Sequence, residues 1–238
     1  MNFNTGISWT EKTWNPTIGC TKVSQGCKHC YAERMAYDLK AKGIKIYADG
    51  FKLKLIPSRL NEPKAISTPS LIFVNSMSDL FHDDVPDDYI QKVFTVMNEC
   101  PQHTFQVLTK RPERLVALSH ELLFTGNIWV GVSVENDTVL ERMDLLKQVP
   151  AKVKWLSLEP LLGPLPNLDL DGIDWVVVGG ESGEKFRTME VDWARELRDQ
   201  CVGKNVPFFF KQYSGKYPKA LGDKLDGRQW HEYPKAAA

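Results

Sequence analysis

Three cysteines stand close together near the start of the chain, in the segment GCTKVSQGCKHCY that contains Cys20, Cys27 and Cys30. Their spacing is C-x6-C-x2-C, and thiolates are soft ligands that suit iron–sulfur clusters and zinc. A cubane cluster has four irons, so three thiolates leave one iron open to a small molecule. The spacing therefore predicts a metal centre, which we interpret first as a [4Fe–4S] cluster.

Two other interpretations of the cysteines stay open. A closed zinc site needs a fourth ligand, which His29, His82 or His103 can supply. The thiols can also be plain core residues, but the segment Thr21–Gly26 between the first two cysteines is too polar for a core strand. Cys100 and Cys201 lie elsewhere, and we expect them on the buried faces of helices.

Composition and charge restrict the class of protein. The 238 residues include 30 Lys or Arg and 30 Asp or Glu, so the net charge is zero. A net charge of zero argues against tight, non-specific binding to duplex nucleic acid, although a local basic groove stays possible. We find neither a signal peptide nor an apolar run near the roughly 20 residues that a membrane span needs. We therefore expect a cytoplasmic protein without membrane contact, in which five cysteines indicate metal or redox chemistry.

Short apolar runs alternate with amphipathic segments along the chain. The runs are rich in β-branched and aromatic residues and are bounded by polar residues or glycine, as is typical of strands buried on both faces. We expect strands at 71–75, 104–109, 127–134, 153–158, 174–179 and 206–210, and a first short strand at Pro16–Gly19. We expect helices at 32–42, 87–100, 112–120, 138–149 and 192–203.

Repeated strand–helix units predict an α/β fold with parallel strands, either a partial or complete (β/α) barrel or a doubly wound open sheet. We favour the barrel, as a single domain over residues 1–212, with residues 213–238 as a C-terminal extension that packs on it. Polar residues cluster just after the strands, where sites form in parallel α/β folds. They are Ser76–Asp79, Lys110–Arg111, Glu135–Asn136, Glu159, Glu181 and Lys211–Gln212.

The cysteine loop resembles that of the radical S-adenosylmethionine (AdoMet) superfamily, in which three cysteines follow the first strand of a partial barrel. The commonest spacing there is C-x3-C-x2-C with an aromatic residue before the last cysteine; this chain has a longer first gap and His29 at that position. The blocks NPTIGCTKVSQGCKHCYAE, FVNSMSDLFHDDVP, LTKRPERL, WVGVSVEN, LSLEPLLGPL, WVVVGGESG and VPFFFKQ together resemble a widespread phage and prophage family of uncertain biochemical role.

The superfamily resemblance implies AdoMet as a cosubstrate and an external electron donor such as flavodoxin or ferredoxin. It implies contacts to AdoMet from Ser76, Ser78 and Asp79 at the amine, from Lys110 at the carboxylate, and from Ser133, Glu135 and Glu159. The place of Lys110 is similar to an arrangement in spore photoproduct lyase. Each of these residues also has a structural interpretation, as a turn, a helix cap or a surface lysine.

The implied reaction is a radical modification or repair of a nucleic-acid base or nucleotide, with Glu181 and Lys211 as substrate contacts. We expect Arg111, the rival cation next to Lys110, to point to the opposite side of its strand. The alternative function is a zinc-stabilised nucleic-acid-binding protein without catalysis. The aromatic residues of the tail offer either stacking surfaces for bases or a packed cover for the barrel.

Overall fold

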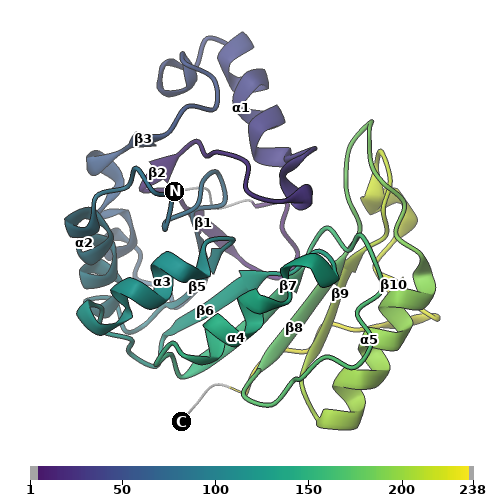
Figure 1. Ribbon diagram of the computed structural model, residues 1–238. Helices are drawn as coiled ribbons and strands as arrows, with labels where there is room; N and C mark the ends of the chain where they lie inside the picture. The colour runs from purple at the N-terminus through teal and green to yellow at the C-terminus, as the bar shows by residue number, and fades with distance from the viewer. Residues whose placement is uncertain (1–4, 236–238) are drawn as a thin grey trace.

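Seven strands form one parallel sheet in a computed structural model that describes residues 5–235. Their spatial order is β1-β4-β5-β6-β7-β8-β9, and the sheet curls without closing (Figure 1). The predicted α/β fold with parallel strands is therefore confirmed, as a partial rather than a complete barrel. The strands are β1 (Lys12–Trp14), β4 (Leu71–Val74), β5 (Thr104–Thr109), β6 (Ile128–Ser133), β7 (Val153–Leu158), β8 (Trp175–Gly179) and β9 (Phe208–Gln212).

Helices α2 to α5 cover the outer face of the curled sheet, whereas α1 lies apart from them, beyond the carboxyl ends of the strands (Figure 1). Each of the five helices lies close to the position expected from the sequence. The helices are α1 (Tyr31–Ala41), α2 (Asp87–Asn98), α3 (Pro112–Leu118), α4 (Glu141–Lys147) and α5 (Val191–Lys204).

The strands are buried on both faces, and alternate residues enter two different cores. On β8, Val176 and Val178 join the large core beneath the helices, while Trp175 and Val177 join a second cluster on the other face of the sheet. The run of three phenylalanines in β9 divides in the same way, because Phe209 alone belongs to the second cluster. This alternation explains why the strands read as nearly continuous apolar runs.

Aromatic rings fill the inner, concave side of the sheet. Trp155 and Trp175 have ring centroids 5.3 Å apart, and Trp9 lies 5.3 Å from Trp155 and 6.2 Å from Trp175. Tyr233, near the C-terminus, stacks on Trp175 at 5.3 Å. Both ends of the chain thus help to close the interior of the partial barrel below the strand ends.

The predicted first strand at Pro16–Gly19 is wrong. The first strand of the sheet is β1, where Trp14 is fully buried and pairs with Val74. Residues 17–18 instead form β2 (Thr17–Ile18), which pairs antiparallel with β3 (Lys54–Leu55) outside the sheet. The segment KTW contains one apolar and two polar residues, so its sequence pattern does not predict a strand. It forms a strand because it pairs with β4.

The end of the chain continues the packing of β9. Phe210 N donates to Trp230 O at 2.8 Å, Glu232 N donates to Phe208 O at 3.2 Å, and β10 (Lys224–Leu225) pairs with β11 (Arg228–Gln229) just before. The ring of Trp230 lies 6.0 Å from that of Phe208, and the ring of Tyr233 lies 5.6 Å from that of Phe209, so both rings pack on β9. The division of the chain into a barrel domain and an extension at residue 212 stays a prediction. Residues 1–4 of the predicted barrel domain and residues 236–238 of the predicted extension lie outside the described part of the chain.

In residues 5–235, no helix is both long and apolar enough to cross a membrane.

The contact between Gly131 and Trp155 yields a test of the inner core. A Cβ atom on Gly131 would lie 2.5 Å from Trp155 Cε2, and the indole is held by its neighbours. Gly131→Ala is therefore expected to lower the free energy of unfolding by about 1–3 kcal/mol, the usual scale of overpacking. Denaturant unfolding measures this loss. Gly203→Ala, where a Cβ meets no described atom within 4 Å, is the control; an equal loss in both variants would contradict the account.

Candidate metal centre and ligand cavity

Gly19 starts the cysteine loop with a turn that only glycine fits. Its φ is +81°, and a Cβ there would lie 2.2 Å from Lys52 O. Gly19 N donates to Met77 O at 2.9 Å, and Cys20 N donates to Phe51 O at 3.2 Å. The backbone at the first cysteine is thereby fixed between the turn after β4 and the segment before β3.

The three cysteines line one cavity at the carboxyl ends of the strands. Burial raises the pKa of Cys20 to about 11, with Asp79 adding to the shift and Arg111 opposing it. Burial also raises the pKa of Cys30. Over residues 5–235, no group of three or more His, Cys, Asp or Glu side chains is already arranged to hold a metal ion. The donor set of three thiols on one loop fits a cluster, but its sulfurs would have to draw together to bind one.

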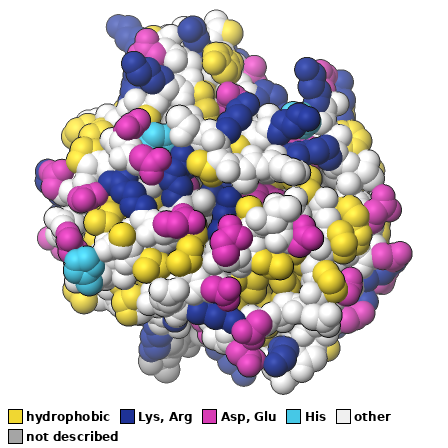
Figure 2. Space-filling model, in the orientation of Figure 1, with side chains coloured by type: hydrophobic (Ala, Val, Ile, Leu, Met, Phe, Trp, Pro, Cys, Tyr) yellow, Lys and Arg dark blue, Asp and Glu magenta, His cyan; other side chains and the backbone are white. Residues whose placement is uncertain are grey.

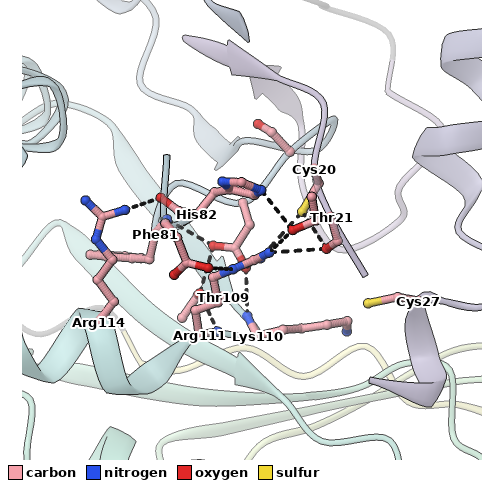
Figure 3. A network of polar contacts seen from close by, with 12 residues as sticks. Cys20, Thr21, Cys27, Phe81, His82, Thr109, Lys110, Arg111 and Arg114 are labelled. Carbon is pink, nitrogen blue, oxygen red and sulfur yellow. Dashed lines mark hydrogen bonds and ion pairs between the residues drawn. The ribbon is translucent and has the colours of Figure 1, made fainter. Parts of the chain in front are cut away.

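Arg111 holds the first part of the loop (Figure 3). Its Nη2 donates to Thr21 O at 3.2 Å and to Thr21 Oγ1 at 2.8 Å, and its Nη1 lies 3.5 Å from Cys20 Sγ. Asp79 Oδ2 accepts from Arg111 Nη1 at 3.3 Å. The expectation that Arg111 points away from the site is wrong, because the chain turns into α3 directly after β5 and both Lys110 and Arg111 line the cavity.

Glu135 holds the middle of the loop. Its Oε1 accepts from Ser24 Oγ at 2.7 Å and lies 3.0 Å from Lys110 Nζ, while its Oε2 accepts from Arg142 Nη1 at 3.1 Å. Burial alone would raise the pKa of Glu135, but Lys110 and Arg142 hold it below its usual range. Gly26 packs so closely on this carboxylate that a Cβ there would lie 2.3 Å from Oε1.

Glu181 holds the last part of the loop. Its Oε2 lies 3.1 Å from His29 Nδ1 and accepts from Arg187 Nε at 2.9 Å. Arg187 Nη1 also donates to Gln25 O at 3.0 Å, and Arg34 Nη1 donates to Ser182 O at 3.4 Å. Burial would raise the pKa of Glu181, but the hydrogen bonds from Arg187 and His29 lower it. The loop after β8 is thus joined to the cysteine loop by charged contacts.

The rest of the cavity has an apolar base and a polar wall. Trp9, Phe73 and Leu108 line it from the aromatic cluster, and Ser76, Ser78, Ser133, Ser157, Glu159 and Lys211 line it from the strand ends. Glu159 Oε1 lies 2.8 Å from Lys211 Nζ. Glu159 Oε2 accepts from Trp9 Nε1 and from Ser157 Oγ, each at 3.2 Å. Such a cavity suits an organic ligand with charged ends.

The polar turn after β4 is bound mainly to the protein itself. Ser76 Oγ accepts from Asn15 Nδ2 at 3.1 Å, and Ser78 Oγ donates to Thr17 O at 2.9 Å. Asp79 Oδ1 accepts from Phe81 N at 3.0 Å, the turn contact that was the structural alternative for this residue. The hydroxyls still border the cavity, whereas the Asp79 carboxylate is occupied by protein donors.

The histidines differ in their distance from the cysteines. His29 lies on the cysteine loop and lines the cavity. His82 Nε2 lies 2.9 Å from Thr21 Oγ1, at the edge of the site (Figure 3). His103 is buried elsewhere, where its Nε2 lies 3.1 Å from Ile66 O. Of the three zinc ligands considered from the sequence, His29 therefore fits best.

The contacts involve residues that sequence patterns did not identify. Glu135 is bound by Ser24 and Arg142, and Glu181 is bound by Arg187. In addition, Tyr31 OH donates to Ser76 O at 2.5 Å. Arg142 lies in α4, seven residues after Glu135, so the shared turn of a βα unit is the one sequence signal for that pair. The partners on the cysteine loop are far apart in sequence from the strand ends and carry no such signal.

The fold and the site define an α/β protein whose partial parallel barrel carries a three-cysteine loop at its carboxyl rim. A family model described as "Protein of unknown function (DUF5131)" matches residues 4–234, so the chain belongs to the DUF5131 family. No curated protein matches the chain.

Two solved structures of spore photoproduct lyase are similar to the chain. One is a mutant with bound AdoMet and dinucleoside spore photoproduct, with 11% identity and a TM-score of 0.48. The other is a further mutant, with 13% identity and a TM-score of 0.45. Each match covers 84% of this chain and 63% of the lyase chain, so the chain spans less than two thirds of the length of those lyases.

Glu135 provides a test of how the cysteine loop is held. Glu135→Gln leaves Lys110 and the buried Arg142 without their counter-charge, and losing one partner of a buried pair costs about 3–5 kcal/mol. Faster amide hydrogen exchange is expected in residues 21–29, together with a lower free energy of unfolding. Glu184→Gln, which removes an exposed ion pair with Lys216, is the control. Unchanged exchange in the loop would contradict the assigned contact.

The same variant has a defined pH dependence. Because the pKa of Glu135 lies below its usual value of 4.5 in the folded chain, its charge stabilises the fold fully above about that pH. The stability difference between the wild-type chain and Glu135→Gln is expected to shrink as the pH falls through the lowered pKa. Denaturant unfolding at several pH values measures it, and a difference that grows with acidity would reverse the assignment.

Proposed function

We propose that the chain is a radical AdoMet-type [4Fe–4S] enzyme of the cytoplasm, acting on a nucleic-acid base or nucleotide. The observation that supports this most directly is the cavity that Cys20, Cys27 and Cys30 share with an apolar base and a polar wall. Three soft thiol donors on one loop suit a cluster with one open iron. A partial parallel barrel provides the rim on which such a loop and its ligand meet.

When bound, the cluster would supply one electron to the sulfonium of AdoMet, giving methionine and a 5′-deoxyadenosyl radical that removes hydrogen from the substrate. Trp9, Phe73 and Leu108 exclude water from the base of the cavity, which protects a radical from side reactions. Lys110 presents its ammonium to the cavity beside Glu135. An external one-electron donor such as flavodoxin or ferredoxin completes the proposal.

The individual ligand contacts follow from which groups remain accessible. We assign the AdoMet carboxylate to Lys110, and further polar contacts to Ser76, Ser78, Ser133 and Glu159, all of which line the cavity. Asp79 and Glu135 act on the ligand through their partners, because protein donors occupy their oxygens and their side chains are only 8% and 1% exposed, against 13% for Glu159. Glu181 and Lys211 border the side where a substrate enters.

Local charge favours an anionic substrate. Residues 20–54 include eight Lys or Arg and three Asp or Glu, a net charge of +5 in a chain with no net charge. Figure 2 shows Lys and Arg side chains gathered on the part of this face that α1 and the loops after β8 and β9 occupy. Phosphates of a nucleotide or polynucleotide match such a surface. The phage association stays a prediction from motif resemblance.

A zinc-stabilised binding protein is the second candidate, because His29 lines the same cavity as the three cysteines. Metal analysis separates the two. An anaerobically purified cluster protein is brown and contains iron and sulfide, whereas a Cys3His zinc site is colourless. Formation of 5′-deoxyadenosine and methionine after adding reductant and AdoMet supports the radical function, and a colourless zinc protein rejects it.

Single replacement of a loop cysteine tests the ligand set. Cys20→Ala, Cys27→Ala and Cys30→Ala are each expected to abolish iron binding, because each removes one of only three proposed thiolates. Cys100→Ala and Cys201→Ala are controls, since both thiols are buried away from the loop. Iron and sulfide analysis after anaerobic reconstitution is the measurement. Full iron content in Cys20→Ala would leave a C-x-x-C site and reject the three-thiolate proposal.

Replacement of Lys110 tests the binding of AdoMet. Lys110→Ala is expected to retain iron and colour but to weaken AdoMet binding by about 1.5–3 kcal/mol, the scale of a hydrogen bond to a charged group. This equals roughly a ten- to hundred-fold higher dissociation constant. Lys92→Ala, on the surface of α2 and paired with Asp88, is the control in the same titration. Unchanged affinity in Lys110→Ala would show that another group binds the carboxylate.

A further inference from the structure

We propose that the buried Asp79–Arg111 ion pair sets the reduction potential of the cluster through Cys20. The inference rests on the proposed function, because it concerns the metal centre that the three cysteines would hold. It assigns to Arg111 a role distinct from ligand binding, and it removes Asp79 from the contacts to AdoMet.

The guanidinium of Arg111 is fixed next to one sulfur. The side chain is 6% exposed, and its Nη1 lies 3.5 Å from Cys20 Sγ. Two hydrogen bonds from Nη2 to Thr21, at 2.8 and 3.2 Å, hold the plane of the group in this position (Figure 3). Arg111 therefore stays beside Cys20 instead of swinging between the loop and a ligand.

Asp79 fixes Arg111 from the other side and is itself fully bound. Its Oδ2 accepts from Arg111 Nη1 at 3.3 Å and from Lys110 N at 3.0 Å. Its Oδ1 accepts from Thr109 Oγ1 at 2.8 Å and from Phe81 N at 3.0 Å. The Asp79 side chain is 8% exposed, so water screens little of its charge.

Other titratable groups near Cys20 have a weaker electrostatic effect on its sulfur than Arg111 and Asp79 have. Asp83 Oδ2 lies 4.0 Å from Arg111 Nε, but its side chain is 78% exposed and well screened. His82 contacts Thr21 Oγ1, and burial followed by the charge of Arg111 lowers its pKa, which keeps the ring neutral near pH 7. The charges that act on Cys20 at short range are thus those of Arg111 and Asp79.

The two charges have opposite effects on a bound cluster. A donor and cation at a ligating sulfur withdraws negative charge from the metal and favours the reduced form. A carboxylate nearby favours the oxidised form. Removing Arg111 takes away the cation and leaves Asp79 unbalanced beside Cys20, whereas neutralising Asp79 leaves the cation unopposed. A merely structural pair would give no such reversal of sign.

The test is an anaerobic potentiometric titration of the reconstituted full-length chain with dithionite and mediator dyes. Arg111→Gln is expected to lower the equilibrium constant for one-electron reduction about tenfold, a shift of about 59 mV. Asp79→Asn is expected to shift the potential in the opposite direction. Arg114→Gln is the matched control, because Arg114 lies three residues after Arg111, in α3, but contacts His82 O, Val85 O and Asp87.

The outcomes separate this inference from the proposed function. Opposite shifts in Arg111→Gln and Asp79→Asn with an unchanged Arg114→Gln support it. A full cluster whose potential moves in neither variant, or in the same direction in both, overturns it and leaves the function intact. A wild-type chain that holds no four-iron cluster rejects both. Where Arg111→Gln fails to retain iron, Asp79→Asn alone still decides the sign, because an unchanged or lowered potential in that variant overturns the inference.

Discussion

The structure depends on the attachment of a polar, eleven-residue loop, residues 20–30, to the ends of a parallel sheet by buried charges. The cysteine loop has no apolar core of its own between Cys20 and Cys30, and Gly26 is its one buried residue over 21–29. Arg111, Glu135 and Glu181 bind it in turn, one from each of three strand ends. Buried charges are stable only when they are paired, so loop and strand ends must fit each other closely.

The sheet makes this attachment possible. Parallel strands bring their carboxyl ends to one rim, and inner rings such as Trp155 and Trp175 close the space below it. A cavity results that is apolar at its base and charged at its mouth, with the sulfurs on one side. In such a setting, charges interact strongly with a ligand because little water screens them. The proposed chemistry and the proposed control of the potential by Arg111 both follow from this arrangement.

The sequence predicted the parallel sheet well because burial on both faces leaves long apolar runs, and it predicted the rim because polar residues follow each run. It misplaced the first strand, since KTW has no such run and forms a strand only by pairing with β4. Its assignment of Asp79 and Glu135 to the AdoMet contacts stays a prediction, and it did not identify their protein partners, Arg111 and Arg142. Those partners were missed because a carboxylate at a strand end looks the same in sequence whether it binds a ligand or an arginine.

The central claim is that three thiolates of this loop hold a cluster with one open iron that binds AdoMet. Electron paramagnetic resonance of the anaerobically reconstituted and reduced chain, recorded with and without AdoMet, tests it most directly. The account predicts the signal of a reduced [4Fe–4S] cluster and a clear change of that signal when AdoMet is added. A chain without a cluster signal, or a cluster signal that AdoMet leaves unchanged, would contradict it.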